Sequence, residues 1–184
     1  MKKKHGWIIV LAICIFLASI PYLFALNHIR MLKKNLDNPI VNAGYPGWRK
    51  VYLDENLRIK LPGYWSMEMG DTIKIYDESQ TLVMIGEKYI GDGLLNDHAC
   101  INKYVGSKVI SSRYERFSNN LFGNMAGVSR QFYTFETNEE RSFVFIHLPY
   151  SKYKQEDYGY YLYFLEDSET NCDLAEAIAY SMED

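Results

Sequence analysis

The sequence lacks the short motifs on which several large enzyme classes depend. It has no glycine-rich loop to cradle a phosphate, no Gly-x-Ser-x-Gly turn to present a nucleophilic serine and no His-Glu-x-x-His pair to bind zinc. It also contains no internal repeat and no low-complexity tract. These absences disfavour catalysis by those three routes.

Acidic residues are nearly absent from the first 44 positions. Asp37 is the only one of the 23 acidic residues found there, whereas six of the 20 lysines and arginines precede position 45. The remaining chain has 14 basic and 22 acidic residues and therefore carries a net charge of about −8, against −3 for the whole. Nucleic-acid sites need clustered cations, so we expect no nucleic-acid partner.

No charged residue occurs in the 20 positions that begin at Trp7 and end at Leu26. A helix of that length, at about 1.5 Å per residue, crosses a hydrocarbon core of about 30 Å. We therefore predict a transmembrane signal-anchor helix over residues 7–26, behind a short basic cytoplasmic tail of residues 1–6. Its partner is the lipid bilayer.

A cleaved signal peptide is the alternative to this anchor. Signal peptides have a shorter apolar region, about 7–15 residues, and end at a small-x-small site. The best candidate here, residues 23–25 (Leu-Phe-Ala), has a large residue where a small one is needed, and no Leu-x-Gly-Cys lipobox occurs. Lys2, Lys3 and Lys4 favour a cytoplasmic N-terminus, although three cations just after the segment nearly match them. We predict a single-pass cell-membrane protein with an extracytoplasmic domain; secretion after cleavage remains the alternative.

Residues 27–47 predict a stalk and linker, because the chain is broken at Asn38-Pro39 and again across residues 44–47. The folded domain is then expected over residues 48–184. Alternating apolar and polar side chains, or runs with both faces apolar, predict short antiparallel strands within it. The predicted strands are residues 57–61, 65–69, 72–76, 82–90, 109–117, 128–135, 143–148 and 160–165.

Apolar residues at helical spacing predict two helices. One covers residues 94–105, and the other covers residues 170–182, where Thr170 and Asp173 resemble a capping box. The fold class predicted is α+β: an N-terminal transmembrane helix, then a twisted antiparallel sheet of about six to eight strands. One mid-domain helix and a C-terminal helix pack on that sheet.

Three segments together resemble the PsbP-like α/β/α fold. They are LRIKLPGYW at residues 57–65, GDTIKIYD at residues 70–77 and LAEAIAYSME at residues 174–183. The resemblance implies a twisted antiparallel sheet with helices on both faces. It also implies a secreted or lumenal accessory protein rather than an enzyme, and it transfers no site residue, since a shared fold does not carry function.

A few side chains are candidates for chemistry. Asp97, His98 and Cys100 lie close together in the sequence, and His147 would have to join them to complete a metal site or a thiol–base pair. The alternative is that His98 borders an apolar helix face and Cys100 is a small buried group. Cys100 and Cys172 are an even pair that either forms a disulfide or stays as two buried thiols.

Tyrosines crowd one stretch late in the chain. Tyr150, Tyr153 and Tyr158 fall in a predicted loop, where a role as strand residues does not explain them, and tyrosine is enriched where proteins bind partners. They form the candidate partner surface.

The leading hypothesis is a membrane-anchored, extracytoplasmic, non-catalytic binding or accessory module for a protein or cell-envelope partner, with no catalytic residue, metal or cofactor assigned. An enzyme or metal-binding protein using Asp97, His98, Cys100 and His147 is the first alternative. The second is a ligand sensor that signals through a membrane partner, since a tail of about six residues is too short for an output domain.

Overall fold

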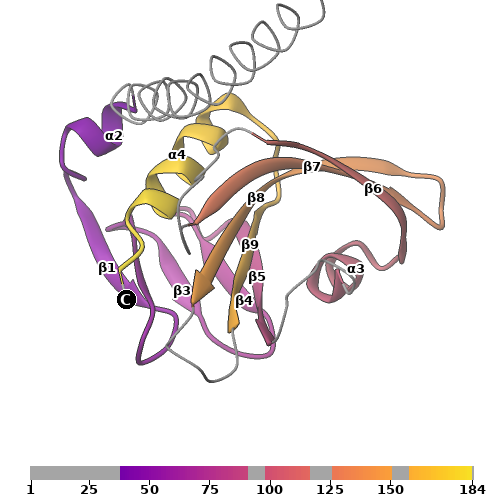
Figure 1. Ribbon diagram of the computed structural model, residues 1–184, viewed down its shortest axis with the longest axis horizontal. Helices are drawn as coiled ribbons and strands as arrows, with labels where there is room; N and C mark the ends of the chain where they lie inside the picture. Colours follow the sequence, from indigo (N-terminus) through magenta and orange to yellow (C-terminus); the bar gives the residue numbers. More distant parts are fainter. Residues whose placement is uncertain (1–37, 91–97, 117–125, 151–157, 184) are drawn as a thin grey trace, which may run out of the picture. The chain divides into compact units, whose positions relative to one another are not determined.

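The computed structural model describes residues 38–90, 98–116, 126–150 and 158–183, which are mostly β-sheet (Figure 1). In chain order the elements are α2 (Pro39–Asn42), β1 (Trp48–Tyr52), β2 (Arg58–Pro62), β3 (Ser66–Glu68), β4 (Ile73–Tyr76), β5 (Leu82–Ile90), α3 (Ala99–Val105), β6 (Val109–Arg116), β7 (Gly127–Phe135), β8 (Glu140–Tyr150), β9 (Tyr158–Phe164) and α4 (Glu169–Tyr180).

The main sheet has seven strands in the order β3-β4-β5-β9-β8-β7-β6, and every neighbouring pair is antiparallel. After β5 the chain passes through α3 to the far edge, where β6 begins. The meander from β6 to β9 then returns strand by strand until β9 pairs with β5. β1 and β2 form a separate two-stranded sheet.

β8 and β9 lie inside the sheet because both of their faces are apolar. Val144, Ile146 and Leu148 point to one side and Phe143 and Phe145 to the other, and all five are 5% exposed or less. Strands covered on both sides read as continuous apolar runs rather than alternating ones. The sheet therefore has two cores, one on each face.

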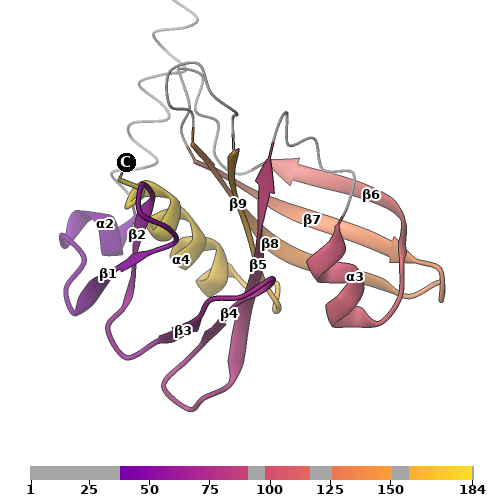
Figure 2. The ribbon, with the colours of Figure 1, turned by 90° about the horizontal axis from the view of Figure 1, so that it is seen from below.

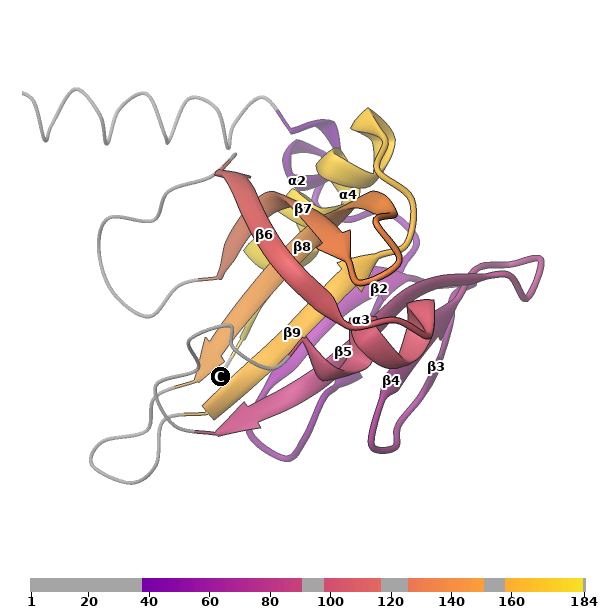
Figure 3. The same ribbon diagram turned by 90° about the vertical axis from the view of Figure 1, so that its right-hand side faces the viewer.

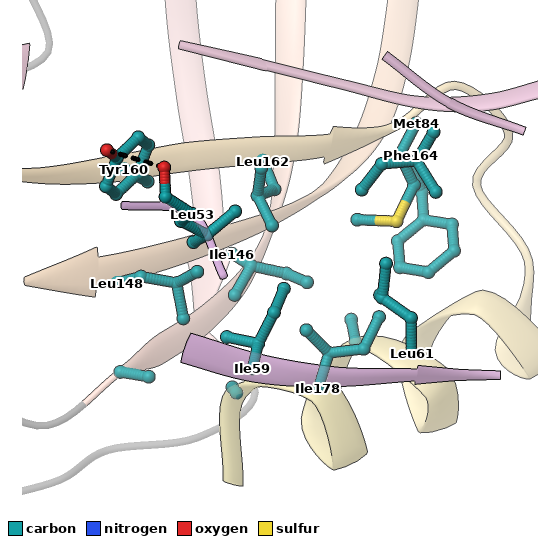
Figure 4. Close-up of a cluster of buried hydrophobic side chains, with 14 of the residues drawn as sticks. Leu53, Ile59, Leu61, Met84, Ile146, Leu148, Tyr160, Leu162, Phe164 and Ile178 are labelled. Carbon is teal, nitrogen blue, oxygen red and sulfur yellow. Dashed lines mark hydrogen bonds between the residues drawn. The ribbon is translucent and has the colours of Figure 1, made fainter. Parts of the chain in front are cut away.

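The first face is covered by α4 and by the β1–β2 sheet, and we call it the α4 face (Figures 1 and 2). Its close-up shows Ile59 and Leu61 of β2 and Ile178 of α4 meeting side chains of β5, β8 and β9 (Figure 4). These three side chains are 1% exposed or less. Full burial of an aliphatic side chain contributes about 1.5–3 kcal/mol relative to leaving it exposed.

The second face is covered in part by α3, and we call it the α3 face (Figure 2). It is rich in aromatic rings, with Tyr133, Phe135, Phe143 and Tyr163 each 1% exposed or less. Tilted pairs hold these rings together, such as Tyr133 with Phe143 at 5.8 Å between centroids. Aromatic pairs in such arrangements contribute beyond the area that they bury.

Asp54 fastens the β1–β2 connection to the main sheet. Its carboxylate accepts hydrogen bonds from the backbone N–H of Asn56 and Leu57, at 2.8 and 2.9 Å, and from the Tyr160 hydroxyl at 2.9 Å. Tyr160 lies in β9, and its hydroxyl also donates to the Leu53 carbonyl at 3.1 Å (Figure 4). Burial alone raises the pKa of Asp54, but the hydrogen bonds that it accepts lower that pKa overall.

The prediction of an α+β fold with one sheet behind a transmembrane helix is wrong. The described residues are mostly sheet, in one seven-stranded and one two-stranded antiparallel sheet, with three helices. Alternation in residues 57–61 identifies a strand but not its partner, because a buried face says nothing of which backbone lies alongside. That partner is β1, and the short helix α2 lies inside the expected linker.

Among the described residues, none of the helices combines the length and the hydropathy needed to cross a membrane. The predicted anchor, residues 7–26 with Trp7 and Leu26 at its ends, lies outside the described residues.

We predict that Gly86→Ala destabilises the protein. A Cβ at position 86, in β5, would lie 2.6 Å from the Tyr161 carbonyl oxygen and collide with the Leu162 side chain. Such overpacking costs about 1–3 kcal/mol, which corresponds to a melting temperature about 2–12 °C lower by circular dichroism.

Gly127→Ala is the matched control, because Gly127 also lies in a strand but a Cβ there meets nothing within 4 Å. We expect it to change the free energy of unfolding by no more than about 0.5 kcal/mol. Equal losses in the two variants would contradict the close approach of β9 to Gly86.

Candidate functional site

The candidates His98 and Cys100 lie at the start of α3, on the α3 face. His98 precedes the helix and makes no capping hydrogen bond through its side chain. The cap comes from β5 instead: Glu87 Oε2 accepts the backbone N–H of Cys100 at 3.1 Å. A carboxylate suits this position, because the first turn of a helix has N–H groups with no partner inside the helix. Glu87 therefore ties α3 to the sheet.

The Cys100 thiol is poorly suited to nucleophilic or metal chemistry. It is 3% exposed, and burial raises its pKa well above the usual range, with the negative charge of Glu87 raising it further. The thiolate is the nucleophile and the metal ligand, so a thiol that stays protonated at neutral pH performs neither role. The location of Cys100 fits a buried structural group.

His147 lies in β8 within a cluster of three rings. Its Nε2 is 2.7 Å from the Tyr89 hydroxyl. Tyr89 of β5 stacks on Tyr161 of β9 at 4.4 Å between centroids, and His147 lies 5.4 Å from each of them. Gly159 permits this packing, since a Cβ there would collide with the Tyr89 ring. Cys100 and His147 are thus held by different neighbours, Glu87 for the thiol and Tyr89 for the imidazole.

The other predicted residues are dispersed. Cys100 and Cys172 are both free, and they belong to the cores on opposite faces of the sheet. Within the described residues no group of three His, Cys, Asp or Glu side chains could hold a metal ion. Asp97 lies outside the described residues.

The structure describes Tyr158 of the predicted tyrosine surface. Its ring is half-buried under the Lys88 ammonium, 4.1 Å from the centroid, and its hydroxyl accepts a hydrogen bond from Asn56 at 3.4 Å. Tyr158 thus packs within its own domain. Tyr150 ends β8, and Tyr153 lies outside the described residues.

A hollow that no motif in the sequence predicts lies at the β6 end of the main sheet. Its volume is about 500 Å³. We call it the β6–β8 hollow, and it is lined by Ser111, Ser112, Arg113, Phe132, Tyr133, Thr134, Glu140, Arg141 and Ser142. Hydroxyl groups and two guanidinium groups dominate this lining, so the hollow suits a polar ligand or partner.

Arg113 is the cation of the hollow whose guanidinium makes no ion pair within the described residues. Its guanidinium lies 3.9 Å from the centroid of the Phe132 ring, a cation–π contact that holds it in place. Arg141, by contrast, is paired with Glu139 at 2.7 Å. Within the described part of the chain, no hydrogen bond or ion pair is found for the Arg113 guanidinium. Arg113 is therefore positioned and available to bind an anionic group.

The strand that carries Arg113 is the exposed edge of the main sheet (Figure 3). Ile110 and Tyr114 of β6 are 57% and 63% exposed. The Glu115 side chain is 65% exposed and approaches Arg130 only at 4.0 Å. A sequence signal for this edge existed: unlike residues 143–148, residues 109–116 have no face that is apolar throughout.

No protein-family model matches the chain, and no curated protein is significantly similar to it. The resemblance to the PsbP-like fold therefore stays a prediction, and the function has to be inferred from the geometry.

We predict that Cys100 is inert in the native protein. Because its thiol is buried and its pKa is raised, iodoacetamide at pH 7.5 should alkylate Cys100 at least about tenfold more slowly than in 6 M guanidinium. Peptide mass spectrometry measures the modification of Cys100 separately from that of the other cysteines. Rapid alkylation of the native protein at Cys100 would revive the thiol-enzyme hypothesis.

Proposed function

We propose that the chain is a non-catalytic binding module, tethered to a membrane by residues 7–26, that binds a protein or cell-envelope partner at the β6–β8 hollow. The observation that carries this proposal is Arg113, held over Phe132 at 3.9 Å in a hollow of about 500 Å³. A fixed guanidinium surrounded by hydroxyl groups is a typical arrangement for binding a carboxylate or another planar anion.

Two further observations support binding over catalysis. The candidate nucleophile Cys100 has a raised pKa and is capped by Glu87, so it is not activated. The hollow, in contrast, lies on an exposed edge where a large partner has access. The proposal places the binding surface at the β6 edge rather than around Tyr158, whose ring and hydroxyl are used within the domain.

The extracytoplasmic location is part of the same proposal and rests on the sequence. The 20 uncharged residues from Trp7 to Leu26 are long enough to span a bilayer, and the three lysines before them favour a cytoplasmic N-terminus. In this arrangement the domain presents its hollow at the outer surface of the membrane.

We predict that a photo-crosslinking amino acid at Ser142, which lines the hollow, captures the partner in intact membranes. Arg113→Ala in the same chain should reduce the adduct about tenfold or more, because a charge-assisted hydrogen bond contributes about 1.5–3 kcal/mol. Arg113→Lys should retain only part of it, since lysine cannot form a bidentate pair. Adduct formation is measured by immunoblotting and mass spectrometry.

A photo-crosslinker at Lys74, exposed on β4, is the control for non-specific capture. The proposal is wrong if Ser142 gives no more adduct than Lys74, or if Arg113→Ala leaves the Ser142 adduct unchanged.

We also predict that the intact chain stays in the membrane pellet after extraction with alkaline carbonate, whereas a chain without residues 7–26 is released. A burial of about 20 apolar residues in the bilayer explains this retention. Intact mass spectrometry of the protein in the pellet then shows whether residues 1–26 are still present. Release of the full-length chain, or a mature protein that begins after position 26, would contradict the anchor and support secretion.

A further inference from the structure

β6 is built to pair with another strand. It ends the seven-stranded sheet, and among the described strands it pairs with β7 alone. Every side chain from position 110 to position 115 is exposed, and Ile110 and Tyr114 expose more than half of their surface. An edge strand has a row of unpaired N–H and C=O groups, which is a template for a further strand.

The charges on β6 define what that further strand must carry. Arg113 pairs in register with Phe132 of β7 and Glu115 pairs with Arg130, so both project on the α4 face, two residues apart. Arg113 is held over Phe132, and Glu115 remains 65% exposed. A complementary strand therefore places a carboxylate opposite Arg113 and a cation opposite Glu115.

β6 itself meets this requirement. We propose that two copies of the chain pair antiparallel through β6, with Tyr114 of each copy at the twofold axis. Arg113 of one copy then lies opposite Glu115 of the second copy, and the reverse pair forms by symmetry, since opposed residues of an antiparallel pair share a face. The inference rests on the proposed function and names the partner of the β6 edge as a second copy of this chain.

The charges select this register over its neighbours. A twofold axis perpendicular to the sheet keeps each face on its own side, so allowed registers differ by steps of two residues. Sliding one strand by two residues in one direction places Arg113 opposite Arg113 of the second copy. Sliding it by two residues in the other direction places Glu115 opposite Glu115. Like charges directly opposite are destabilising. The register with Tyr114 at the axis has two ion pairs and no such clash.

Local charges at the edge, rather than the net charge of the domain, select the strand that pairs. The domain carries a net charge of about −8 from position 45 onward, which repels any acidic partner at long range, a second copy included. At physiological salt this repulsion is screened beyond about 8 Å. Directly opposed charges at the edge then decide which strand pairs, and the alternating signs of Arg113 and Glu115 suit a copy of the same strand.

Sedimentation and light scattering of the full chain in detergent micelles test this pairing. We expect a reversible dimer for the parent chain. Arg113→Glu and Glu115→Arg should each raise the dissociation constant at least about tenfold, because each reversal creates two like-charge pairs. The double variant Arg113→Glu/Glu115→Arg recreates both ion pairs and should return the constant to within about threefold of the parent. Lys74→Glu, a charge reversal on β4, is the control and should have no effect.

A parent chain that is monomeric at all concentrations, or a double variant as weak as the single ones, overturns the pairing. Tyr114→Cys gives an independent readout: opposed cysteines at the axis should form an intermolecular disulfide on mild oxidation, whereas the parent chain and Lys74→Cys should not. Absence of that disulfide also counts against the register. A monomeric chain whose Ser142 crosslinks to a different protein in an Arg113-dependent manner refutes the self-pairing and leaves the proposed function standing.

Discussion

The pairing of β5 with β9 is the interaction on which the rest of the domain depends. It joins residues 82–90 to residues 158–164, so that a small meander and a four-stranded meander become one sheet. Bringing such distant segments together has a loop-closure entropy cost, and burial on both faces of the joined strands offsets it. Tyr163, Leu162 and Phe164 are all fully buried on completion of this pair. Gly86 allows the two backbones to approach closely.

Burial on both faces then divides the domain into two chemically different sides. The α4 face is mainly aliphatic and is closed by α4 and the β1–β2 sheet, with the Asp54–Tyr160 hydrogen bond at its margin. The α3 face is aromatic and includes Glu87, Tyr89 and His147 among its rings. Glu87, Tyr89 and His147 are tolerated among these rings because they are hydrogen-bonded, Glu87 to the backbone N–H of Cys100 and Tyr89 to His147.

Within the described residues, neither α3 nor α4 covers the β6 edge, where Ile110, Arg113, Tyr114 and Glu115 are exposed. Natural sheets protect edges with charge and with bulges, and β6 has a register shift between Val109 and Ser111 as well as opposite charges. The same charges that exclude unsuitable strands admit a complementary one. Protection and recognition can therefore reside in one strand.

Sequence periodicity predicts where strands lie along the chain, whereas contacts between distant segments are seen only in the tertiary structure. Alternation and apolar runs place strands near the positions of every strand from β2 to β9, because burial of a face leaves a period of two in the sequence. The same reasoning missed β1, the separate two-stranded sheet and the hollow, and it proposed a cluster of Asp97, His98, Cys100 and His147. Spacing along a chain does not show which side chains meet across strands, and the structure gives Cys100 and His147 different neighbours.

By itself, therefore, the sequence determined the approximate positions of most strands and of two helices, the acidic charge of the domain and the uncharged run from Trp7 to Leu26 that predicts its tether. Those properties depend only on neighbouring residues. Only the tertiary structure decided that the main sheet ends at β6, that Phe132 supports Arg113, and that Arg113 and Glu115 share one exposed edge. Strand order and register arise from contacts between distant segments, and their free energy is distributed over the whole core rather than encoded in any single stretch.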